Sequence, residues 1–189
     1  MVSCMISLLV WRNSIRPRSQ PVSWFHIVWF TQCVPRHAFV VWLVLREKLK
    51  TQDKLQTWEV NDTQILLCSL CNSCPDSHNH LFFDCPFSNE VWRKAQQVIK
   101  LPFWSFNWKD FPGIISPIAS LNSANAKLMY AATIYYIWQE RNRRLFKGLK
   151  RSPARLYDDI VSTVRIKLLS VRFKESRQVK ELKIAWQLP

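Results

Sequence analysis

Glycine is nearly absent from this chain: only Gly113 and Gly148 occur among its 189 residues. Phosphate-cradling loops and dinucleotide-binding turns need several glycines at fixed spacing, because the backbone must approach the phosphate closely. Tight two-residue hairpins favour glycine as well. The scarcity therefore argues against P-loop and dinucleotide-binding enzymes, and against a sheet rich in tight hairpins.

Long apolar runs and a secretory leader are also missing. The richest apolar stretch, Ala38 to Leu45, is eight residues long, whereas a membrane-spanning helix needs about 20. Residues 1–10 show neither the positively charged start nor the small-residue cleavage site of a signal peptide. We therefore expect a soluble intracellular protein in a reducing compartment, the nucleus included, without a membrane partner.

Acidic residues are few, with 13 Asp and Glu against 27 Lys and Arg, and the formal net charge is +14. Residues 88–189 carry a net charge of +12, and residues 141–183 carry +10. Such a surface attracts RNA or DNA through phosphate contacts. The predicted nucleic-acid-binding residues are Arg141, Arg143, Arg144, Lys147, Lys150 and Arg151. Cations in the last turns of a helix are also favoured by its dipole, so a merely solvated face is the alternative.

The apolar pattern predicts a mainly α-helical fold: short helices around a metal-binding loop, followed by two longer amphipathic helices. Apolar residues make up 48% of the chain and include ten Trp and eleven Phe, enough for a core. The expected helices cover residues 23–31, 35–45, 51–58, 88–99 and 123–147, and a last one begins at 152–153. Ser88, Ser123 and Ser152 are the expected caps of the longer helices, and Gly148 is placed to end the 123–147 helix.

The buried faces of the two longer helices follow from a period of about 3.6 residues. In the 123–147 helix the face should contain Leu128, Ala131, Tyr135, Trp138 and Leu145. In the last helix it should contain Tyr157, Ile160, Val161, Val164 and Leu168.

Four potential metal ligands fall within eighteen residues, in the pattern Cys68-x2-Cys71-x8-His80-x4-Cys85. Thiolates and imidazoles in a tetrahedral set are the ligands that structural zinc prefers, and four of them leave no open position for catalysis. We therefore predict one structural Zn²⁺. Cys74 and His78 lie between the pairs as alternative ligands, and a disulfide set or ordinary buried thiols are the competing interpretations.

These motifs together resemble the zinc-binding domain that follows the reverse transcriptase in plant LINE-type non-LTR retrotransposons. The similar segments are Trp24-x4-Trp29, Pro35-Arg36-His37-Ala38-Phe39-x2-Trp42-Leu43, Leu49-Lys50-Thr51-Gln52-Asp53-Lys54-Leu55-x2-Trp58, Cys68-Ser69-Leu70-Cys71 and His80-Leu81-Phe82-Phe83-Asp84-Cys85-Pro86-Phe87-Ser88-x2-Val91-Trp92. The resemblance covers residues 24–92, and residues 137–142 are similar to a helix often found downstream. It implies zinc at Cys68, Cys71, His80 and Cys85, and nucleic-acid association in support of a polymerase.

The resemblance also suggests a division of the chain. We expect a loosely matching lead-in at 1–23, the reverse-transcriptase-type zinc-binding domain at 24–100, a proline-containing linker at 101–122 and a basic helical extension at 123–189. The polymerase domain itself is not expected in this chain.

Catalytic residues are not apparent, and we predict no enzymatic activity. A reverse transcriptase holds its metal ions with an aromatic-x-Asp-Asp turn, but Tyr157 directly precedes Asp158 and Asp159 in a helical pattern. His26 and His37 lie in apolar segments without a nucleophile. The expected function is zinc-dependent, non-catalytic association with RNA or DNA. The alternatives are a zinc-braced module that docks a retroelement polymerase or a host protein, and a decayed transposon fragment without a selected function.

Overall fold

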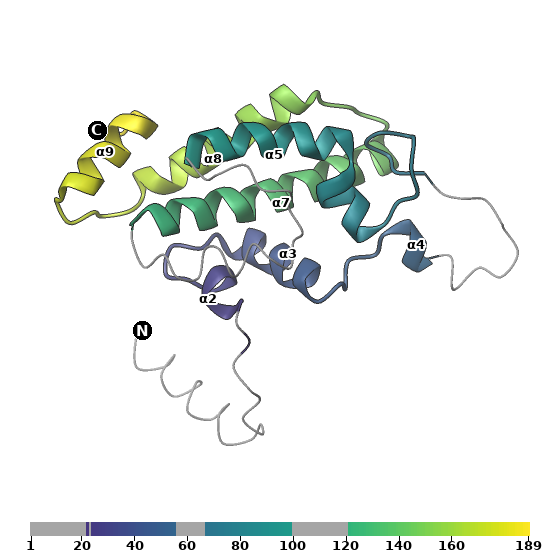
Figure 1. Ribbon diagram of the computed structural model, residues 1–189, viewed down its shortest axis with the longest axis horizontal. Helices are drawn as coiled ribbons and strands as arrows, with labels where there is room; N and C mark the ends of the chain where they lie inside the picture. The colour runs from purple at the N-terminus through teal and green to yellow at the C-terminus, as the bar shows by residue number, and fades with distance from the viewer. Residues whose placement is uncertain (1–21, 23, 56–66, 100–120) are drawn as a thin grey trace, which may run out of the picture.

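The computed structural model describes residue 22 and residues 24–55, 67–99 and 121–189, and these form a mainly helical fold (Figure 1). The described residues contain no strand, only one antiparallel bridge between Leu67 and Pro75. The elements are α2 (Phe25–Val28), α3 (Pro35–Leu45), α4 (Gln52–Leu55), the π-helical turn η1 (His80–Asp84), α5 (Pro86–Ile99), α7 (Leu121–Lys147), α8 (Pro153–Leu169) and α9 (Arg177–Trp186). The predicted fold class is confirmed.

Helix α7 is the centre of the fold. It packs against α2 and α3 on one side and against α5 and α8 on the other, while α9 contacts it near its N-terminal end (Figure 1). This position explains why Met129, Tyr130, Ala132 and Ile134 are all at most 1% exposed. A helix covered on several sides buries more than one stripe of residues.

The predicted buried stripes are only partly correct. Leu128 and Ala131 of α7 are buried, but Tyr135 and Trp138 are only half-buried and Leu145 is 36% exposed. Helix α7 is covered on several sides, and the residues buried in its C-terminal half are instead Ile137, Glu140 and Arg141. In α8 the buried residues are Leu156, Ile160, Val164 and Leu168.

Helix ends follow the expected signals at two positions and depart from them at others. The hydroxyl of Ser152 accepts from the Arg155 amide at 3.2 Å and caps α8. Gly148 ends α7 with φ of +64°, where a side chain would be strained. Helix α5, however, begins at Pro86 rather than Ser88, and α7 begins at Leu121 rather than after Ser123.

The predicted domain division cannot be followed through its linker, because residues 100–120 lie outside the described residues. Residues 1–21 and 23 of the lead-in and residues 56–58 at the end of the third expected helix lie outside them as well. The segments on either side of 100–120 pack together, since α3 and α5 both contact α7. No helix in the described part of the chain is both long enough and apolar enough to span a bilayer.

A buried histidine in this core makes stability depend on pH. His37 in α3 is 1% exposed, its ring centre lies 4.4 Å from that of Tyr135, and its Nε2 has no hydrogen-bond partner among the described residues. Burial and the nearby Arg36 charge lower the pKa of His37 from 6.5 to about 4. The folded state therefore binds fewer protons than the unfolded state between these values, and its stability falls as the pH drops through that window.

We expect acidification from pH 7 to pH 4.5 to cost the protein up to roughly 3 kcal/mol through His37 alone. The measurement is urea unfolding across this range, with zinc content determined at each pH. His37→Phe should flatten the curve, whereas the exposed His26→Gln control should not. An identical pH dependence in wild type and His37→Phe would show that His37 is not the titrating group.

Candidate metal centre and basic cluster

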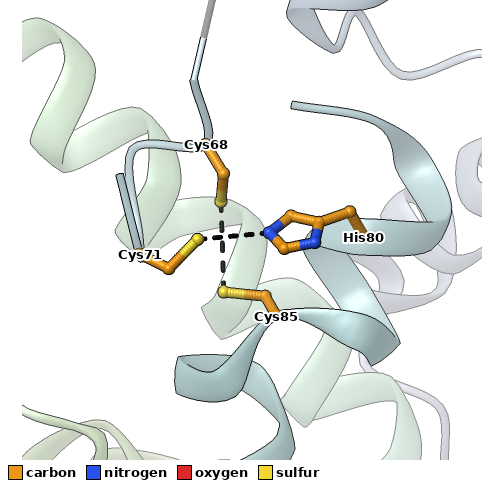
Figure 2. A group of neighbouring side chains, drawn as sticks. All are labelled: Cys68, Cys71, His80 and Cys85. Atoms are coloured by element: carbon orange, nitrogen blue, oxygen red, sulfur yellow. Dashed lines mark hydrogen bonds between the residues drawn. The ribbon is translucent and has the colours of Figure 1, made fainter. Parts of the chain in front are cut away.

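Three thiols and one imidazole converge on a common point in the described structure (Figure 2). The Sγ atoms of Cys68 and Cys85 lie 4.0 Å apart, and Cys71 Sγ lies 3.2 Å from His80 Nε2. All four ligand atoms are within 4.8 Å of one another. Figure 2 draws these two contacts as dashed lines that cross between the four residues, so the four ligand atoms surround a shared centre.

These spacings fit zinc and not a disulfide. A tetrahedral zinc ion with ordinary bond lengths requires ligand atoms about 3.8 Å apart for two sulfurs and about 3.5 Å apart for sulfur and nitrogen. A disulfide needs about 2.05 Å between sulfurs, and all described cysteines are free thiols. The donor set therefore fits one structural Zn²⁺ held by Cys68, Cys71, His80 and Cys85. Four protein ligands fill its coordination shell.

A tight turn brings Cys68 and Cys71 to the same side of this centre. The amide of Asn72 donates to the carbonyl of Cys68 at 2.7 Å, and Asn72 takes φ of 56°, a conformation that asparagine tolerates better than most residues. The Cys68 amide donates to the Cys74 carbonyl at 2.8 Å. Cys74 thus contributes its backbone to the loop, while its thiol is exposed and outside the cluster.

The π-helical turn η1 brings His80 and Cys85 together. The Cys85 amide donates to the His80 carbonyl at 2.7 Å, five residues back, so both side chains reach the same face. Two side chains of α5 satisfy carbonyls of this unusual turn: Ser88 Oγ donates to Leu81 at 2.6 Å and Trp92 Nε1 to Phe82 at 2.7 Å. Ser88 is therefore not a helix cap but a support for the metal-binding turn.

The two buried sulfurs are electrostatically coupled. The hydrogen bond from Cys68 lowers the pKa of Cys85, and the backbone amides of Ser88 and Phe87 lower it further against the effect of burial. The same hydrogen bond to Cys85, together with burial, raises the pKa of Cys68. Amides at the start of α5 thus favour a thiolate at Cys85, the form that a metal ion binds.

The alternative histidine ligand points elsewhere. His78 is buried, and its Nε2 lies 3.2 Å from the Leu49 carbonyl, which links the metal-binding loop to the segment after α3. Burial lowers the pKa of His78, with the charge of Lys54 acting in the same direction. Among the described residues, the group that could hold a metal ion contains His80 and not His78.

Arg141, predicted to bind nucleic acid, is instead an interior residue. It is 2% exposed, and its guanidinium forms an ion pair with Asp76, which is 1% exposed. Arg141 Nε lies 3.1 and 3.3 Å from the two carboxylate oxygens. Asp76 also accepts from the Gln52 amide at 3.0 Å. This pair fastens the end of the metal-binding loop to α7, so Arg141 cannot reach a phosphate in this conformation.

Arg144 holds the turn between the first two cysteines. Its Nη1 donates to the Leu70 carbonyl at 2.8 Å and to the Ser69 carbonyl at 3.3 Å, and its Nε donates to Glu140 at 2.9 Å. Its guanidinium also lies 4.5 Å from the centre of the Phe87 ring. This cation therefore connects α7, the metal-binding turn and α5.

Arg151 completes an internal ionic network around Glu140. Both its amide and its Nε donate to the Glu140 carboxylate at 2.8 Å, and its Nη1 donates to Asp159 at 2.7 Å. Glu140 is fully buried. Burial opposes ionisation, but the Arg151 amide and the Arg144 and Arg151 guanidinium groups outweigh it and lower the Glu140 pKa.

The other three predicted nucleic-acid-binding residues lie outside this ionic network. Lys147 and Lys150 are exposed and Arg143 is half-buried, and the side chains of these three residues form no ion pair or hydrogen bond with another described residue. Arg143 Nε is buried without a partner among the described residues. The predicted cluster thus divides into an internal group (Arg141, Arg144 and Arg151) and three free cations (Arg143, Lys147 and Lys150).

Sequence reasoning did not identify Asp76, Glu140 or Ser88 as residues that support the metal-binding loop. The spacing of Glu140 and Arg144 at i and i+4 on one helix is a signal that could have revealed their ion pair. Asp76 and Arg141 are 65 positions apart, and nothing local links them. The Asp158-Asp159 pair lies in the first turns of α8, where Asp159 pairs with Arg151 and Arg155.

Residues 7–92 match the family model described as zinc-binding in reverse transcriptase. The match spans a little under half of the 189-residue chain and contains all four clustered ligands. It includes residues 24–92, on which the resemblance in sequence is based. No curated protein and no solved structure matches the chain. The matched family and the Cys₃His cluster both support a zinc-binding module.

Proposed function

We propose that this chain is a zinc-braced, non-catalytic module that binds RNA or DNA, derived from the zinc-binding domain of a plant LINE-type retrotransposon reverse transcriptase. The matched family supports the relationship to a reverse transcriptase. The non-catalytic role is supported by the ligand set, since four protein ligands leave the zinc ion no open position.

The main support for nucleic-acid binding is the set of three free cations, Arg143, Lys147 and Lys150, at the end of α7. Arg143 and Lys147 are one helical turn apart and line the same groove, and Lys150 lies in the loop that follows. Because these charges have no acidic partner among the described residues, they are available to phosphates without breaking an ion pair. The internal cations Arg141, Arg144 and Arg151 would serve binding only by holding α7 against the zinc loop.

We expect the zinc-loaded protein to bind a mixed-sequence 20-nucleotide RNA and its DNA counterpart with an affinity that falls steeply between 50 and 200 mM salt. Removing one cation that neutralises a phosphate reduces the slope of log K against log salt by about 0.7 to 0.9. Arg143→Gln/Lys147→Gln/Lys150→Gln should therefore lower the slope by about 2. Fluorescence anisotropy measures both quantities.

A matched variant separates a local site from the effect of total charge. Arg172→Gln/Lys174→Gln/Lys180→Gln also removes three cations, but from the segment around the start of α9. It should leave the slope nearly unchanged. Equal reductions in both variants would mean that only the overall charge matters. Absence of salt-dependent binding in the wild type would reject nucleic-acid binding and leave the protein-docking alternative.

A further inference from the structure

A groove of about 520 Å³ lies at the C-terminal end of α7, beyond the segment that matches the zinc-binding family. Its lining includes Gln139, Asn142, Arg143, Phe146 and Lys147. These positions recur at intervals of three and four residues, so they form one continuous face of the helix. The groove therefore presents cationic, amide and aromatic side chains together.

Phe146 is the unusual member of this face, because its side chain is 80% exposed. An exposed phenylalanine does not gain the free energy that burial of its apolar surface would give. Its ring is therefore accessible on the surface of the helix. A cation one position further on, Lys147, and another three positions back, Arg143, flank it. An exposed ring between cations has the elements that proteins use to bind a nucleic-acid strand: stacking for a base and positive charge for the backbone.

The two amide side chains of this face, Gln139 and Asn142, add hydrogen-bond donors. Gln139 Oε1 accepts from Arg151 at 3.2 Å, and Asn142 Oδ1 accepts from Arg141 at 3.1 Å. With their oxygens occupied in this way, the –NH₂ groups have no hydrogen-bond partner among the described residues and can donate to base or phosphate oxygens. The internal guanidiniums thus orient these amides.

We propose that this groove binds single-stranded nucleic acid, with one unpaired base stacked on Phe146 and the neighbouring phosphates on Arg143 and Lys147. The proposal rests on the nucleic-acid binding proposed above and specifies the form of the ligand. In a duplex each base is already stacked between its neighbours and cannot offer a face to a ring on a helix surface. Stacking on Phe146 therefore selects unpaired strands.

The test compares binding of 16-nucleotide single strands, RNA and DNA, with binding of blunt duplexes of the same sequence at 100 mM salt. The full chain is used with zinc bound. Wild type should prefer the single strands, and Phe146→Ala should lose about tenfold in affinity for them with little change for duplexes. Phe146→Trp should retain the preference, and Phe146→Leu, apolar but without a ring, should lose it.

Ile184→Ala is the matched control, because Ile184 is 79% exposed but lies on α9. It should change neither affinity, and thermal melting should show all variants folded. If single strands and duplexes bind equally and Phe146→Ala has no effect while the cation variants do, this inference is wrong and the proposed function stands. If the wild type shows no salt-dependent binding to either form, both fail.

Discussion

Replacing Cys85 with serine is expected to remove the zinc ion and most of the stability of the fold. Cys85 is fully buried, and it joins the metal centre to η1 and to the start of α5. Structural zinc contributes about 10–16 kcal/mol of apparent binding free energy in small zinc modules, comparable with the net stability of a whole domain. We expect zinc content by mass spectrometry to fall from one equivalent to none, and the thermal transition to broaden or disappear.

Two control variants make this prediction specific. Cys74→Ser removes an exposed thiol of the same loop and should keep both zinc and melting temperature. The histidines separate metal loss from general damage: His80→Gln should lose zinc, whereas His78→Gln should lower stability by weakening the link to Leu49 but keep zinc. Reduced, metal-free protein that melts like the wild type would refute the structural role of zinc.

The metal centre could be predicted from sequence because its determinants are local. The two-residue gap between Cys68 and Cys71 requires a turn, and the four-residue gap between His80 and Cys85 suits a turn closed by a hydrogen bond to the fifth residue. Both pairs are therefore formed largely by nearby backbone. Only their approach to each other depends on distant contacts.

The long helices were predictable for the same reason, and their packing was not. Gly148 and the Ser152-Pro153 pair mark helix ends through their own conformational preferences. In contrast, the stripe through Tyr135, Trp138 and Leu145 assumes a helix covered on one side, whereas α7 is covered on several. Helix α9 was not predicted, although Ser176 caps it by accepting from the Val179 amide at 3.2 Å.

The basic cluster shows the limit of charge as a sequence signal. All six residues carry the same charge, yet three of them form ion pairs with acids that the fold brings to them. Asp76 comes from the metal-binding loop and Glu140 from the preceding turn of α7. Which cations are free is therefore a property of the tertiary structure, and net charge alone could not reveal it.

The second large effect is expected at the ion pair between Arg141 and Asp76. Arg141→Gln removes the charge that neutralises a carboxylate only 1% exposed. Breaking a buried ion pair by removing one partner costs about 3–5 kcal/mol, because the remaining charge is left without compensation. Urea unfolding should show this loss for Arg141→Gln, and Arg143→Gln, two positions along the helix, should change stability by less than about 0.5 kcal/mol.

A double-mutant cycle identifies the pair as the cause. Asp76→Asn keeps an oxygen that can accept from the Gln52 amide but removes the charge, so Arg141→Gln/Asp76→Asn should be less destabilised than the sum of the single variants. Simple additivity would mean that the two groups do not interact in solution.

The same variants separate an effect on folding from an effect on nucleic-acid binding. If Arg141 only anchors the zinc loop, Arg141→Gln that remains folded at low temperature should bind nucleic acid with the wild-type salt slope, whereas Arg143→Gln should reduce it.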